Sequence, residues 1–244
     1  MWYKLKKIYI RANNQEKQVR PHVPAPTVYE INYDLRWGNL ADLQAAWFDW
    51  VAVNWWYQFT SDWLQQTSTG NDKWVSVYKT GLDLTNAKKI TIRSLWYWYR
   101  SSWSNGKDVA LIQSEAFTPT INDRPSVRYP RRLWNIVPNT NSASYCNQWI
   151  YYANSSWTET AISQTSIRTI QSWDTTLELI LDLDNKTVNF THSWANNNSW
   201  NAILTDAQIT EIRWMKSAVW NWWRWYSSND AYERLKEVYL KIEY

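Results

Sequence analysis

The chain has 244 residues, enough for one large β-domain or two small ones, and a single β-sandwich with a short N-terminal extension is the better expectation. The excess of 26 basic over 22 acidic residues is too small to predict nucleic acid binding. Cys146 is the only cysteine, which excludes an intrachain disulfide and a cysteine-based metal site. His22 and His192, the only histidines, lack the spacing of a zinc motif or the setting of a catalytic triad.

The N-terminal sequence lacks the long apolar core of a secretory signal, and no apolar run approaches the length of a transmembrane helix. We therefore expect a chain that is made in a cytoplasm and does not span a membrane.

The composition is unusual in having 22 tryptophans and 4 glycines. A chain of this length ordinarily carries glycine at roughly 7%, or about 17 residues. Many tryptophans lie in Ser-, Asn- and Asp-rich segments that are typical of turns, where glycine is the default residue. These segments are 101–108, 154–160, 170–176 and 192–202.

Two hypotheses account for the excess of tryptophan and the shortage of glycine. In the first, the gene uses UGA as a glycine codon, so that many printed tryptophans stand at glycine positions. In the second, the chain is rich in tryptophan and most of the rings lie in a core or an interface. Ordinary β-backbone at Trp103, Trp157, Trp173 and Trp194 would count against recoding. Under recoding, residues 221–230 form a glycine-rich loop.

The first 26 residues predict a segment separate from the main domain. Residues 3–10 alternate as an edge strand, and the proline-rich stretch 19–27 is typical of an extended linker. We expect residues 1–26 to form this strand and linker, and residues 27–244 to form one sandwich domain.

Alternation with a period of two dominates the rest of the chain. The expected strands are 28–35, 51–59, 74–84, 88–99, 108–117, 144–153, 159–170, 175–183, 186–192 and 234–244. A turn at Asp184-Asn185 predicts a hairpin between two of them.

Two short helices are expected between the strands. Residues 39–47 follow Asn39 as a candidate N-cap, and residues 205–216 carry a capping box formed by Thr205 and Gln208. Many strands with two short helices predict an all-β antiparallel sandwich of the jelly-roll type.

Catalytic and metal sites have weak signals in this sequence. A glycosidase needs two carboxylates that face each other across a cleft, and the nearest approach is Glu178, Asp182 and Asp184 on one strand. We interpret them as a solvent-facing row, so no catalytic residues and no enzyme are expected. Loops at 70–72, 104–108 and 122–124 supply oxygen atoms for calcium without an EF-hand spacing, so no cofactor is assigned and calcium is only a candidate.

Two groups of residues are candidates for binding. Aromatic side chains of strands 88–99 and 144–153 have flat faces suited to sugar rings, although each is also a candidate for the core; they are Tyr97, Tyr99, Trp149 and Tyr151. A proline-studded stretch at 122–133 suits the docking of a neighbouring subunit or a polyanion, although a solvated loop explains it as well; its arginines are Arg124, Arg128, Arg131 and Arg132.

Three segments carry a resemblance to a known group of proteins: Ile8-Tyr9-Ile10, Val19-Arg20-Pro21 and the block 175–216. In these segments the chain resembles phage structural proteins in which a short strand precedes a concanavalin A-like (laminin-G-type) jelly roll. It implies a virion-associated, non-enzymatic role in a tail, fibre or capsid, with other virion subunits as partners, a homo-oligomeric state and host glycan as a candidate ligand. The alternative is a lectin-like carbohydrate-binding module on a bacterial cell surface.

Overall fold

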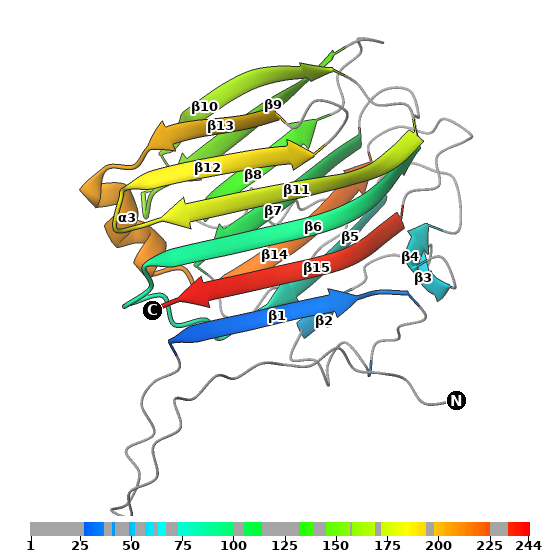
Figure 1. Ribbon diagram of the computed structural model, residues 1–244, viewed down its shortest axis with the longest axis horizontal. Helices are drawn as coiled ribbons and strands as arrows, with labels where there is room; N and C mark the ends of the chain where they lie inside the picture. The colour runs from blue at the N-terminus through cyan, green and yellow to red at the C-terminus, as the bar shows by residue number, and fades with distance from the viewer. Residues whose placement is uncertain are drawn as a thin grey trace, which may run out of the picture.

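Two antiparallel β-sheets lie face to face in this chain, which confirms the expected all-β sandwich (Figure 1). The computed structural model describes residues 27–36, 41, 49–51, 57–60, 63–66, 73–99, 105–113, 132–138, 145–156, 158–168, 172–193, 198–224 and 234–244. The expected strand at 3–10, the linker and nearly all of the helix at 39–47 lie outside these residues.

The eight-stranded sheet contains the first and the last described strands. Its order is β13-β12-β11-β6-β15-β4-β3, and β1 also pairs with β15. β4 and β1 share one edge of β15, since β4 pairs at Arg234 and Leu235 while β1 pairs from Glu237 onward. The strands are β1 (Val28–Asp34), β3 (Tyr57–Thr60), β4 (Trp63–Gln66), β6 (Lys89–Tyr99), β11 (Ser172–Asp182), β12 (Thr187–Ser193), β13 (Asn198–Ile203) and β15 (Arg234–Glu243).

The seven-stranded sheet lies behind the first and has the order β10-β9-β8-β7-β14-β5-β2 (Figure 1). Its strands are β2 (Asp49–Val51), β5 (Lys73–Lys79), β7 (Asn105–Ile112), β8 (Arg132–Pro138), β9 (Tyr145–Ala153), β10 (Glu159–Arg168) and β14 (Ser217–Arg224).

The core lies between the sheets because the strands alternate in polarity. Leu177, Leu179 and Leu181 of β11 are fully buried, whereas Glu178 and Ile180 between them are partly exposed. The same alternation holds along β15 and, from Ile92 to Trp96, along β6, so these three strands have one apolar and one more polar face.

Two buried tryptophans contribute to this core, and both have a hydrogen-bond partner. Trp96 donates its Nε1–H to the Ser94 hydroxyl at 2.8 Å. Trp220 of β14 is 0% exposed and donates to the main-chain carbonyl of Arg93 at 2.8 Å. Because β14 and β6 belong to different sheets, the Trp220 indole joins the two layers.

One helix, α3 (Asp206–Arg213), connects the two sheets at one end of the sandwich (Figure 1). The expected capping box is confirmed: Thr205 Oγ1 accepts from the Gln208 amide at 3.2 Å, and Gln208 Oε1 accepts from the Thr205 amide at 2.8 Å. Ile209 and Ile212 are buried.

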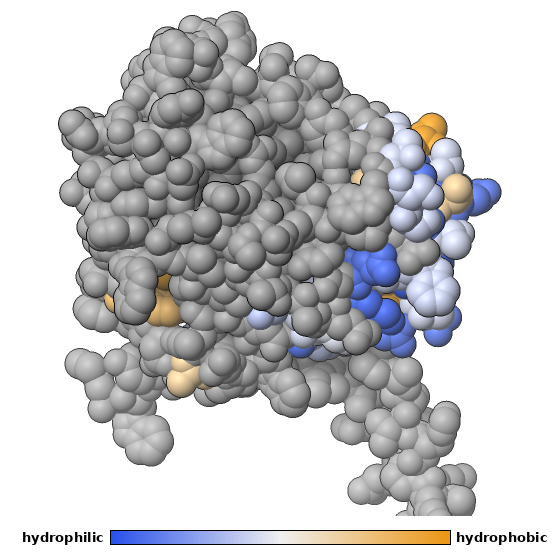
Figure 2. All heavy atoms as spheres, turned by 180° about the vertical axis from the view of Figure 1, so that it is seen from behind, coloured by the Kyte–Doolittle hydropathy of each residue, from blue (hydrophilic) through white to orange (hydrophobic). Residues whose placement is uncertain are grey.

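Seen from behind, the described surface around this end is mainly hydrophilic, with a few small hydrophobic spots in orange (Figure 2). Ile203 and Trp214 are the exposed large hydrophobic residues among the described ones, and they flank opposite ends of α3.

The hairpin expected at Asp184-Asn185 is also confirmed, with Asp182 opposite Thr187. Asp182 Oδ1 and Oδ2 each accept a hydrogen bond from Asn185 at 2.9 Å, which holds the pKa of Asp182 below its usual value. Lys186 ends the turn with φ of 55°, and it is the only non-glycine residue with positive φ in the described ranges.

Several local predictions were wrong. The expected strand at 51–59 is divided between β2 and β3, which belong to different sheets. β4, β8, β13 and β14 were not expected as strands, and segments interpreted as turns, such as 172–176 and 198–202, lie in strands. Ser, Asn and Thr are common in turns, but here they lie in β11 and β13.

The described tryptophans do not occupy glycine-type turns. They lie in strands, apart from Trp214, which caps α3 with right-handed backbone. Trp173 is in β11, which counts against recoding at that position, whereas Trp103, Trp157 and Trp194 lie outside the described residues. The expected glycine-rich loop at 221–230 is wrong for residues 221–224, which belong to β14.

Replacing Trp220 by glycine should lower the free energy of unfolding by at least about 3 kcal/mol, because it removes a fully buried ring from between the sheets. Trp214→Gly, at an exposed helix end, should change that free energy by no more than about 1 kcal/mol. Urea unfolding of the three proteins measures both values. Equal or greater stability of Trp220→Gly would instead indicate that glycine is the native residue.

Candidate functional site

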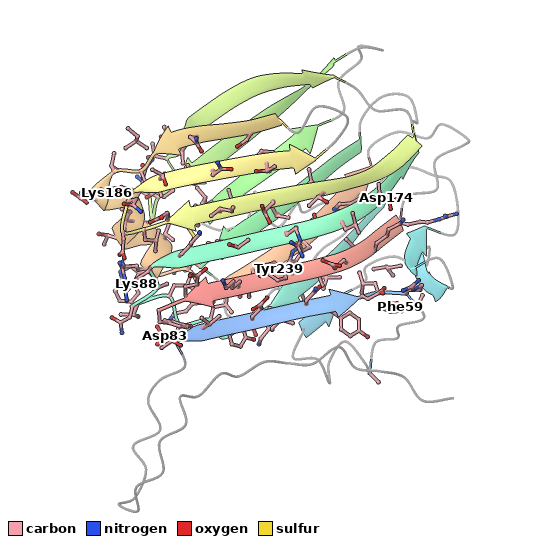
Figure 3. All side chains as sticks on the ribbon, viewed as in Figure 1. Phe59, Asp83, Lys88, Asp174, Lys186 and Tyr239 are labelled. Atoms are coloured by element: carbon pink, nitrogen blue, oxygen red, sulfur yellow. The ribbon has the colours of Figure 1, made fainter. Side chains whose placement is uncertain are left out.

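The outer face of the eight-stranded sheet, the side turned away from the other sheet, carries a band of polar side chains. Its position follows from register: Glu178 pairs with Arg93, and Arg93 pairs with Tyr239. These residues alternate with the buried leucines, isoleucines and valines of the same strands, so their side chains point outward. Figure 3 shows Tyr239 near the middle of this sheet.

Arg93 is the centre of a group that we call the Arg93 cluster, formed with Glu30, Glu178, Glu237 and Tyr239. Its guanidinium donates to Glu237 Oε1 at 2.9 Å and lies 3.8 Å from Glu178 Oε2. The Arg93 Cζ atom also lies 4.3 Å from the centroid of the Tyr239 ring. Arg93 is therefore held on three sides, and its side chain is 31% exposed.

Tyr239 extends the cluster toward β1. Its hydroxyl donates to Glu30 Oε1 at 2.9 Å. Burial raises the pKa of the Tyr239 hydroxyl well above its ordinary value of 10.0, and the hydrogen bond and negative charge of Glu30 raise it further. The Tyr239 hydroxyl is thus a proton donor over the whole physiological pH range.

A row of amides and hydroxyls, which we call the amide row, continues the polar band across β12 and β13. Asn189 Nδ2 donates to Asn201 Oδ1 at 2.5 Å and to Ser199 Oγ at 3.1 Å, and Thr191 Oγ1 donates to Asn189 Oδ1 at 3.1 Å. Thr191 is paired with Glu178, so the row adjoins the Arg93 cluster. Together they offer fixed donors and acceptors on a sheet surface.

A β-bulge fixes one end of this face. The register of β15 against β6 shifts between Leu235 and Glu237, and Lys236 lies in the shift with only 8% of its surface exposed. The Lys236 ammonium contacts both carboxylate oxygens of Asp174, at 2.6 and 2.7 Å. Asp174, which is labelled in Figure 3, belongs to β11, so this ion pair crosses over β6, the strand between β11 and β15.

The predicted aromatic site residues lie in two sheets. Tyr97 and Tyr99 are in β6 of the eight-stranded sheet, whereas Trp149 and Tyr151 are in β9 of the seven-stranded sheet. Tyr97 pairs with Asp174 and Arg234. Their side chains are outside the described part of the structure, so their binding role stays a prediction.

The predicted docking arginines fall almost entirely outside the described residues. Arg124, Arg128 and Arg131 are not described, and Arg132 is the first residue of β8. Subunit docking by this segment also stays a prediction.

The carboxylates considered for a glycosidase have other partners. Glu178 faces Arg93, and Asp182 accepts hydrogen bonds from Asn185 at the turn. They lie on one face of β11 rather than on opposite walls of a cleft, and Asp184 lies in the turn beyond the strand. This arrangement does not provide the opposed acid and nucleophile that glycoside hydrolysis requires.

Within the described ranges, no three His, Cys, Asp or Glu residues come together in a way that would hold a metal ion. The candidate calcium loops at 70–72 and 122–124 lie outside those ranges, and the expectation of a loop at 104–108 is wrong for residues 105–108, which lie in β7. In the same part of the chain, no helix is long and apolar enough to cross a membrane.

The sequence reading missed the Arg93 cluster and the amide row. The alternation of polar and apolar residues in 88–99 and 234–244 indicates that each of these two strands has a polar face. The pairing of β6 with β15, which brings Arg93 to Glu237 across 144 positions of sequence, has no local signal.

The fold is that of lectin-like jelly-roll proteins of known structure. A winged bean acidic lectin complexed with methyl-α-D-galactose has a TM-score of 0.59 and 7% identity over 88% of this chain and 98% of its own. The carbohydrate recognition domain of Emp46p, in a potassium-bound form, has a TM-score of 0.61 and 10% identity over 85% and 94%.

A third structure comes from a virus. The CBM2 module of an evolved Dit protein of Lactobacillus casei BL23 phage J-1 has a TM-score of 0.52 and 7% identity over 93% of each chain. No protein-family model matches the chain, and no curated protein sequence matches it either. At these identities the likeness establishes a concanavalin A-like fold.

Replacing Tyr239 by phenylalanine should reduce the decrease in the free energy of unfolding at alkaline pH. In the wild type, Tyr239 keeps its proton in the folded state above pH 10.0 while the unfolded chain releases it, so stability is full below that pH and falls as the pH rises toward the raised folded pKa. Urea unfolding at several alkaline pH values measures the slope for both proteins. Equal slopes would contradict the burial and hydrogen bonding described for Tyr239.

Proposed function

We propose that this chain is a non-enzymatic, carbohydrate-binding structural component of a phage virion, in a tail, a fibre or a capsid-associated position. Its ligand in this proposal is a glycan of the host surface, and its partners are other virion subunits, including copies of itself. The observation that carries the proposal is the lectin-like sandwich fold, shared over nearly the whole chain with carbohydrate-binding proteins that include a phage module.

The outer face of the eight-stranded sheet supports the binding part of this proposal. Sugars present many hydroxyls, and the amide row and the Arg93 cluster supply donors and acceptors that are already held in place by one another. A site that is ordered before binding loses less side-chain entropy when the ligand arrives.

In this proposal, residues 1–26 connect the domain to a larger assembly by strand addition, and calcium bound by the loop carboxylates and amides is a candidate additional ligand.

We also propose that recoding of UGA as glycine applies to part of the tryptophan set. Its support is the composition of 22 tryptophans and 4 glycines. The extended backbone at Trp173 and the buried, hydrogen-bonded ring of Trp220 argue for native tryptophan at those two positions.

The purified chain should bind polysaccharide from the surface of its host, and Asn189→Ala should weaken binding by roughly fivefold, or about 1 kcal/mol, because it removes the centre of the amide row. Asn86→Ala is the matched control, since Asn86 is exposed in the connection between β5 and β6. A glycan array followed by calorimetry on the strongest ligand measures both. Absence of binding to every host glycan would remove the carbohydrate-binding part of the proposal.

An antibody to the chain distinguishes the virion from the lectin-like cell-surface alternative. The proposal expects labelling of purified phage particles in electron micrographs. Labelling of bacterial cells that carry no phage would support the alternative.

Protein isolated from its natural source should have an intact mass below 29.3 kDa if glycine replaces some tryptophans. Peptide mapping would then show which positions differ, with Trp173 and Trp220 expected as tryptophan. A mass that matches 29.3 kDa would contradict recoding.

A further inference from the structure

Among the described residues, the polar cluster on the outer face of the eight-stranded sheet has a charge opposite in sign to that of the whole chain. The chain carries a formal net charge of +4. The Arg93 cluster, however, combines one cation with the three carboxylates of Glu30, Glu178 and Glu237, which leaves two carboxylates in excess.

The ion pairs around the cluster do not offset this excess. Lys236 is paired with Asp174 at 2.6 Å, Lys241 with Glu243 at 2.8 Å, and Arg36 with Asp34 at 3.0 Å. Each pair is neutral as a unit. When Arg234 of β15, Lys89 of β6 and Asp182 of β11 are counted as well, the described residues of the face still have one carboxylate in excess.

Arg93 itself is poorly placed to receive an anion. Its guanidinium is engaged by Glu237, by Glu178 and by the Tyr239 ring. An acidic ligand at this position would have to displace one of those carboxylates or lie beside both of them. Like charges brought together in an interface are strongly unfavourable.

Glu178 and Glu237 retain acceptor capacity that suits a neutral sugar. An ionised carboxylate has two oxygens with about four acceptor positions. The Arg93 guanidinium uses one oxygen of each, namely Glu178 Oε2 and Glu237 Oε1, and the side chains are 23% and 27% exposed. The other oxygens can accept hydrogen bonds from the hydroxyls of a sugar, next to the donors of the amide row.

We propose that this face selects neutral glycans and rejects acidic ones, and that Glu178 and Glu237 determine this specificity. The inference rests on the proposed carbohydrate-binding function and names its ligand class. Both carboxylates repel the carboxylate, sulfate or phosphate groups of an acidic polysaccharide, and both accept hydrogen bonds from a neutral one.

The test compares the neutral glycan that binds best with a sulfated derivative of the same glycan, using the full chain and calorimetry at low and moderate salt. The wild type should bind the sulfated form at least about tenfold more weakly. The double variant Glu178→Gln/Glu237→Gln keeps the size of both side chains and removes the excess of two carboxylates, which leaves Arg93 balanced by Glu30 alone. It should bind the neutral glycan more weakly and the sulfated form more tightly than the wild type does.

Glu211→Gln is the control, because Glu211 lies on α3 at the end of the sandwich, where it accepts a hydrogen bond from Ser155, and not on a strand of the face. This change should leave both affinities as they are. A circular dichroism melt confirms that the double variant is folded. If it does not fold, the single variant Glu178→Gln is used, since its ion pair at 3.8 Å is the longer one.

The outcomes separate this inference from the function on which it rests. Preference of the wild type for the sulfated glycan, or a double variant with unchanged selectivity, would overturn the charge inference and leave carbohydrate binding intact. Failure to bind any glycan, neutral or sulfated, would overturn both.

Discussion

The hydrogen bond from Trp220 to the carbonyl of Arg93 connects the two sheets and fixes the strand that carries the candidate site. Trp220 belongs to the seven-stranded sheet, and its indole crosses the apolar layer to reach β6. A buried indole N–H without a partner is costly, so this contact restricts how β14 can lie against β6. The side chain of Arg93 leaves the opposite face of the same strand, where it organises the polar cluster.

The position of the cluster is therefore set by the core. Burial of Leu177, Leu179 and Leu181 turns Glu178 outward, and a shift of one residue in register would exchange the two faces. The bulge at Lys236 makes such a shift in β15 and directs a lysine to Asp174 on the other side of β6. Packing between the sheets and the geometry of the outer face are thus parts of one arrangement.

Local signals predicted those parts of the fold that depend on neighbouring residues. The capping box of α3 and the Asp184-Asn185 hairpin are contained within a few positions, and both are present. The strands at 198–203 and 217–224 were missed because their Ser, Asn and Trp residues resemble turn sequences on composition alone. Arg93, Glu178 and Tyr239 come from three strands far apart in sequence, so their proximity could not be derived without the pairing of those strands.

Function depends on the site rather than on the fold, since one sandwich can carry many activities. In the described part of this chain, the polar outer face bears excess carboxylates on a protein of positive net charge. A crystal structure of the chain with its bound glycan tests this account most directly. The account predicts sugar hydroxyls within hydrogen-bonding distance of Glu178, Glu237 and the amide row on the outer face of the eight-stranded sheet. A glycan bound on the seven-stranded sheet, or only among the loops, would contradict it.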